Sequence, residues 1–232
     1  MSFSTTEWAG AETIDDVLER MDEIDKSLPP DDGVATFNRM YYQVTKLVDE
    51  AVDASQFLAG EFLERLDVQF ANLYFSAYAA SLDDAEVPRA WAPLFKARSK
   101  PDTVPIQFAF AGMNAHISHD LPIAVVATCR ELVVIPHADT PEYSDYTKTN
   151  DVLAEAAETI KGWFMTGNLA RLDQLCGRVD DALEMFGIHL ARMAAWDSAE
   201  MLWNLADNPR LDKLFRSGLG RTVELANRGI LL

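Results

Sequence analysis

Two of the four histidines in the sequence lie beside an aspartate, as His116, His119 and Asp120. The surrounding segment, 107–122, is otherwise almost wholly apolar. On an α-helix that turns ~100° per residue, the three side chains fall within an arc of roughly 100°. Imidazoles and a carboxylate that converge in this way can bind a divalent metal ion or transfer protons. We therefore expect them to share an internal cavity, with His116 and His119 as metal ligands or as acid and base, and Asp120 as a third ligand or an orienting group.

A structural interpretation of the same residues remains open. Asp120 precedes Leu121 and Pro122, so it suits the N-cap of a new helix. Near a helix end, His119 could interact with the helix dipole. All three residues would then form a hydrogen-bonded polar network at a helix junction.

Known metal motifs match this chain poorly. The His119–Asp120 doublet resembles that of the HD-type phosphohydrolases, but the only upstream histidine is His116 on the same helix. Segment 150–158 resembles the second magnesium motif of class I terpene cyclases, although Ala154 stands where that motif needs a hydroxyl. The spacing also differs from that of the metalloprotease signatures.

Neighbouring helices must supply the rest of any pocket. A helix expected at 57–80 is apolar nearly all round, which is typical of a central helix. Polar groups on a buried helix need partners, so we expect Asp67 to lie in the interior close to the 107–122 segment. The predicted pocket residues from this helix and from a helix at 35–54 are Asn38, Asp67, Asn72 and Tyr74.

The remaining pattern is helical, and alternating strand-like runs are missing. Pro122 predicts a kink or a fresh helix start between His116 and Pro122. Further along, aromatic residues interleave with Arg192 and Glu200. Such a face could line a pocket, but we interpret it as core with an intrahelical ion pair. The other expected helices are at 13–28, 88–98, 145–166, 169–186, 188–206 and 210–228. We predict one all-α domain over residues 1–232, a helical bundle of eight or nine helices in which residues 1–11 are flexible.

The net charge, the apolar runs and the cysteine spacing limit the partners and the location expected for this protein. The formal net charge is −17 over 232 residues, which argues against nucleic acid and anionic membrane surfaces as partners. The sequence shows neither a signal peptide nor an apolar run of the ~18 residues that a membrane span needs, so we expect a cytoplasmic protein. Cys129 and Cys176 form no Cys-x-x-Cys pair, which makes a disulfide framework or thiolate zinc site improbable.

Four segments, at 37–45, 70–75, 88–95 and above all 111–122, together resemble an uncharacterised bacterial family, known as a domain of unknown function. The similarity runs from about residue 37 to residue 203, with Ser118 where the family has asparagine. The resemblance implies a helical single-domain protein and brings no established activity. Its most specific part is Gly112, Met113, Asn114, Ala115, His116 and Ile117, followed by His119, Asp120, Leu121 and Pro122.

The sequence thus favours an enzyme that acts on a small molecule at a buried His/His/Asp site. If a divalent metal is the cofactor, activation of water for hydrolysis is the simplest chemistry. The alternative is a non-catalytic helical protein that binds a ligand or serves as a scaffold.

Overall fold

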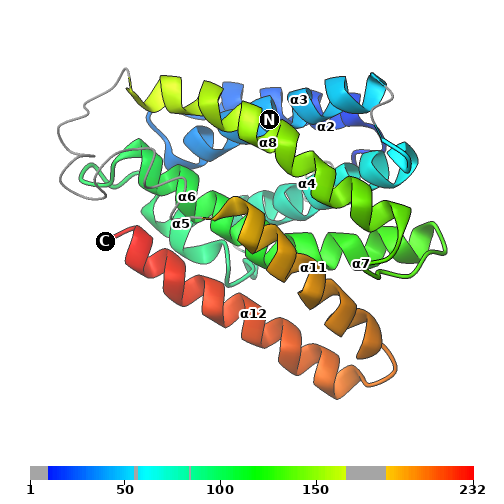
Figure 1. Cartoon of the computed structure of the whole chain (residues 1–232). Coiled ribbons are helices and arrows are strands. Elements are labelled where there is room, and N and C mark those ends of the chain that lie inside the picture. The colour runs from blue at the N-terminus through cyan, green and yellow to red at the C-terminus, as the bar shows by residue number, and fades with distance from the viewer. Residues whose placement is uncertain (1–9, 55–56, 84, 166–186) are drawn as a thin grey trace.

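The computed structural model describes residues 10–54, 57–83, 85–165 and 187–232, and their side chains except those of residues 53 and 155–165. Every regular element in these ranges is a helix, which confirms the all-α prediction (Figure 1). No helix in this part of the chain is both long and apolar enough to cross a membrane. The helix expected at 169–186 and Cys176 lie outside the described residues. The elements are α2 (Ile14–Ser27), α3 (Gly33–Asp53), α4 (Gly60–Leu82), α5 (Ala92–Ala97), α6 (Pro105–Ala115), η1 (His116–Asp120), α7 (Leu121–Glu131), α8 (Pro141–Met165), α11 (Ile188–Asn204) and α12 (Pro209–Ile230).

The first described helix begins where the sequence predicts. Thr13 accepts a hydrogen bond from the Asp16 backbone N–H, and the Asp16 carboxylate accepts from the Thr13 N–H, which completes a capping box. Of the start expected to be flexible, residues 1–9 lie outside the described residues. Ala11 is buried, and its backbone N–H and C=O both bond to the Asn72 side chain. The start of the fold is therefore fixed to α4.

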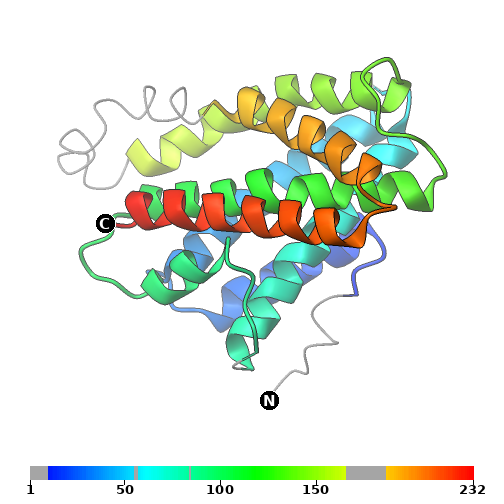
Figure 2. The ribbon, with the colours of Figure 1, turned by 90° about the horizontal axis from the view of Figure 1, so that it is seen from below.

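Helices α4, α6 and α7 run through the middle of the molecule, and the other helices cover them (Figures 1 and 2). Helix α7 packs against α4 and α11, while α3 packs against α2, α6 and α8. Helix α12 lies along α6, η1 and α5. As its all-round apolar pattern predicts, α4 is buried along most of its length.

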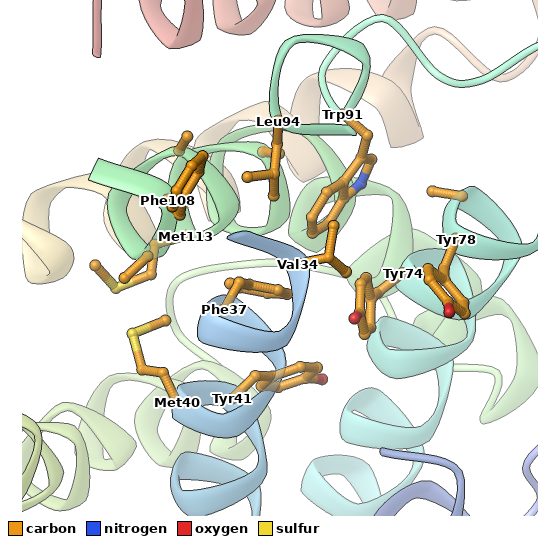
Figure 3. Packing of buried hydrophobic residues seen from close by; sticks show 14 of the residues in the cluster. Val34, Phe37, Met40, Tyr41, Tyr74, Tyr78, Trp91, Leu94, Phe108 and Met113 are labelled. Atoms are coloured by element: carbon orange, nitrogen blue, oxygen red, sulfur yellow. The ribbon is translucent and has the colours of Figure 1, made fainter. Parts of the chain in front are cut away.

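Two hydrophobic clusters make up the described core. The first is rich in aromatic rings: Phe37 lies among Tyr41, Tyr74 and Trp91, contributed by α3, α4 and the turn before α5 (Figure 3). The second joins the N-terminal half of α4 to α7, α8 and α11. Phe70 and Ile117 pack against both clusters, so they mark the boundary between them.

A π-helical turn separates α6 from α7 at His116–Asp120. The Leu121 backbone N–H donates to the His116 carbonyl, five residues back, instead of to a carbonyl four residues back. Pro122 follows directly and has no N–H to give to Ser118, so a wider turn costs little at this position. The predicted discontinuity before Pro122 is confirmed.

Candidate functional site

Asp120 is a buried carboxylate that accepts hydrogen bonds from three side chains. Trp91 Nε1 and His116 Nδ1 lie 2.8 and 3.2 Å from Oδ2, and His119 Nδ1 lies 2.7 Å from Oδ1. Burial by itself would raise the pKa of Asp120, but the hydrogen bonds from the two imidazoles hold it below its ordinary value. The group is therefore ionised at neutral pH. An ionised carboxylate only accepts hydrogen bonds, so each histidine presents Nδ1–H to it.

His116 lies inside an aromatic shell. Its ring stacks on Phe70 with centroids 3.4 Å apart and meets the edge of Tyr41 at 4.5 Å. Burial lowers its pKa, against the opposing influence of Asp120, so the imidazole is neutral near pH 7. With the proton on Nδ1, Nε2 carries a lone pair. That nitrogen is shut off from solvent and has no hydrogen-bond partner among the described residues.

His119 occupies the opposite side of Asp120. Its side chain is 15% exposed, and its ring faces α12, where a Cβ on Gly220 would lie 3.7 Å from Nε2. Only His116 of the two histidines lines the cavity described below. The prediction that both rings share one cavity is therefore wrong. The π-turn is wider than an α-turn and rotates His119 away from His116.

The geometry does not support the predicted metal site. Within the described ranges, no group of three or more His, Cys, Asp or Glu side chains is arranged to hold a metal ion. In His116 and His119 the nitrogen nearest Asp120 is engaged with a carboxylate oxygen as a hydrogen-bond donor. The three residues thus form a hydrogen-bonded triad centred on Asp120.

A cavity of about 120 Å³ lies where the two hydrophobic clusters meet. Its walls come from α3, α4, α6, η1, α7, α8 and α11, and they are mostly aliphatic and aromatic. Tyr41 and Phe70 line it beside His116. Met40 and Met113 approach from α3 and α6 (Figure 3). The described polar or charged side chains in the wall are His116, Asp67, Thr149 and Arg192, together with the Tyr41 hydroxyl.

Asp67 is one of the few polar residues in this wall. The residue is half-buried, but its Oδ2 is closed off from solvent and lacks a partner in the described part of the chain. Burial, and then the nearby charge of Asp49, raise its pKa to about 7 although Arg192 acts in the opposite direction. Asp67 can therefore be protonated or ionised near neutral pH. Its predicted interior position near the segment of His116 is confirmed.

Arg192 and Thr149 complete the polar part of the wall. Neither was predicted from the sequence as a site residue, although Arg192 was noted on a helix face that could line a pocket. Arg192 is buried on α11, and its guanidinium lies 4.2 Å from the Tyr146 ring centroid. The predicted intrahelical pairing is wrong for Arg192, because its guanidinium bonds to α8, while Glu200 accepts from Trp196. The sequence signal for Arg192 was its position among aromatic residues at helical spacing.

The other predicted pocket residues have structural roles instead. Asn38 donates to the Met21 carbonyl and accepts from the Tyr74 hydroxyl, which ties α3 to α2 and α4. Asn72 holds Ala11. None of these three side chains lines the cavity, so only Asp67 of the predicted set belongs to it.

Comparison with known proteins supports the resemblance seen in the sequence and adds no activity. Neither the curated proteins nor the solved structures contain a match to this chain. One family model matches residues 14–232, which include every residue of the triad and the cavity. The chain therefore belongs to the family described as "Family of unknown function (DUF5995)".

Proposed function

We propose that the protein is an enzyme that catalyses proton transfer in a small, mostly apolar substrate, with His116 as the general base. One observation carries the proposal. Asp120 holds His116 through Nδ1, and His116 Nε2, which has no hydrogen-bond partner among the described residues, belongs to a side chain in the wall of an apolar cavity. A carboxylate that fixes the tautomer and orientation of a neutral imidazole is the arrangement that general-base catalysis requires.

The electrostatics of the pocket support two distinct roles. Burial lowers the pKa of His116 and raises that of Asp67, so the first is ready to accept a proton and the second can donate one. Two titratable groups with oppositely shifted pKa values are typical of acid–base pairs in enzymes. In the proposed step, Nε2 takes a proton from the substrate or from a water molecule that attacks it. Asp67 returns a proton to the substrate, and the Asp120 carboxylate stabilises the imidazolium.

A non-catalytic ligand-binding protein is the second candidate. Asp120 is fully occupied by three donors, as in a structural network, and Nε2 of His116 is itself closed off from solvent. In that case the cavity would bind a small apolar molecule and leave it unchanged.

A turnover screen with His116→Gln tests the proposal. The compounds should be small esters, lactones and C–H acids whose apolar part is the size of a benzene ring, followed by NMR in D₂O to detect both products and deuterium incorporation. We expect turnover by the unmodified protein and a loss of about 10²- to 10⁴-fold in His116→Gln, which is the usual contribution of a general base.

His119→Gln is the matched control, because it removes the same side-chain type from the other side of Asp120. Its turnover should fall less than about tenfold. Far-ultraviolet circular dichroism should show that both variants keep their helices. Equal losses in the two variants, or compounds that bind without turnover, would contradict the enzyme and favour the binding protein.

A further inference from the structure

Arg192 is a buried cation in the wall of the cavity, and its partners fix its direction. Nε donates to Asn150 Oδ1 at 2.9 Å, and Nη2 donates to the Tyr146 carbonyl at 2.8 Å and to Thr149 Oγ1 at 2.6 Å. Thr149 in turn donates to the Tyr146 carbonyl at 2.6 Å. These bonds hold the guanidinium against α8, and none of them uses Nη1.

The described hydrogen-bond acceptors of Arg192 are all neutral oxygen atoms. A buried charge normally has a partner of opposite sign, because its removal from water is costly. Asp67 is the only carboxylate among the cavity residues whose side chains the structure describes. With a pKa of about 7, this group is only partly ionised near neutral pH, so it does not fully balance the guanidinium. The described wall therefore carries a partly uncompensated positive charge.

We infer that the cavity binds a small monocarboxylate, with its carboxylate on Arg192 and its apolar body against Phe70, Leu66 and Ile117. The planar guanidinium fork matches a carboxylate in shape and charge. An apolar cavity of about 150 Å³ in another protein accepts benzene, so a volume of about 120 Å³ suits a single ring or a short aliphatic chain. This inference deepens the proposed function by naming its substrate class, since the same cavity is involved.

The direct test compares three ligands of nearly equal shape on the unmodified protein. Calorimetric titrations with phenylacetate, 2-phenylacetamide and 2-phenylethylamine, at about pH 6 where Asp67 is mostly protonated, separate charge from shape. We expect phenylacetate to bind at least about tenfold more tightly than the amide, as a charge-assisted hydrogen bond predicts, and the amine to bind most weakly. Equal affinities for the three ligands, or no binding by any of them, would overturn the inference.

Substitutions then identify the residue responsible. Arg192→Gln should remove the preference for the carboxylate over the amide, whereas Arg192→Lys should retain part of it because the charge remains. Arg216→Gln serves as control, since it removes the same charge from α12, where Arg216 pairs with Asp212. If Arg192→Gln fails to fold, the three-ligand comparison still decides the matter. A carboxylate preference that survives in folded Arg192→Gln would contradict the role of Arg192.

Binding and turnover can fail independently. His116→Gln should still prefer phenylacetate to the amide, because Arg192 and Thr149 are intact. A carboxylate preference in a protein that turns over no compound would support the binding inference and contradict the enzyme. Turnover of neutral substrates without a carboxylate preference would support the enzyme and contradict the binding inference.

Discussion

The two sides of Asp120 place the same side-chain type in two different surroundings. On the inner side, His116 is enclosed by Phe70 and Tyr41 and borders the cavity. On the outer side, His119 makes a shorter hydrogen bond to the same carboxylate but is partly exposed and faces Gly220 of α12. The hydrogen bond to Asp120 is therefore common to both histidines and cannot by itself define a function.

The difference between the two sides lies in desolvation. Burial lowers the pKa of His116, and its remaining nitrogen has no described partner. Such a nitrogen gains most from a ligand that supplies a hydrogen bond, because a buried and unsatisfied polar atom is costly. We therefore assign the proposed proton transfer to His116 on the inner side and a supporting role to His119 on the outer side.

The largest effect on stability should come from Asp120→Asn. An amide cannot accept from both imidazoles and the indole as the carboxylate does, and it lacks the charge that strengthens these bonds. We expect the free energy of unfolding to fall by about 3 kcal/mol, near the range for breaking a buried charged pair. Urea denaturation at neutral pH measures the change.

The outer hydrogen bond gives the control for this substitution. His119→Gln should cost about 1 kcal/mol or less, because its partner Asp120 keeps two donors and the vacated site is partly exposed. If His119→Gln destabilises the protein as much as Asp120→Asn, the outer side contributes more to the triad than we infer.

Asp67→Asn should stabilise the protein at alkaline pH. The folded pKa of about 7 lies above the unfolded value of ~3.9, so the folded state binds more protons between these values and stability falls as pH rises through them. The penalty is complete above pH ~7, and its removal should add about 2 kcal/mol at pH ~8, with a much smaller gain at pH ~5.

Thermal unfolding of Asp67→Asn at both pH values tests this expectation. Glu64→Gln is a suitable control, since Glu64 lies on the exposed side of the same helix. A gain that does not depend on pH would show that Asp67 is not protonated in the folded protein.

Two glycines offer the most local test of the comparison. A Cβ on Gly112 would overlap the ring of Phe37, which belongs to the inner aromatic cluster, so Gly112→Ala should cost about 1–3 kcal/mol. A Cβ on Gly220 would meet His119 at an ordinary 3.6 Å, so Gly220→Ala should stabilise α12 by about 0.5–1 kcal/mol. Chemical denaturation of both variants gives the values. If both substitutions changed the free energy of unfolding in the same direction, the two sides of Asp120 would be packed alike.

Much of the fold could be predicted from local patterns in the sequence. The capping box at Thr13, the break before Pro122 and the start of α11 after Gly187 depend on residues close in the chain. The all-round apolar character of α4 likewise indicates a central helix, since periodicity reports burial directly.

The site was harder to predict, because it depends on geometry and on distant partners. The expected direction of His119 assumed regular α-helical turns, and the π-turn changes that direction. Arg192 reaches the cavity only because α11 packs against α7 and η1 and its guanidinium bonds to α8. Asn72 was expected in the pocket, but its bonds to Ala11 link residues 61 positions apart. Such contacts between residues far apart in the chain leave no trace in the local sequence pattern.

The π-turn also constrains how the chain can change during evolution. It holds one residue more than a regular α-helix would need over the same length, so the buried faces of α6 and α7 are out of phase with an uninterrupted helical repeat. A deletion of one residue at Ser118 would restore a straight helix, but it would move Asp120 to a new angle relative to His116 and Trp91. A change of length in this segment would therefore alter the geometry of the Asp120 triad and the packing of α7 in a single step.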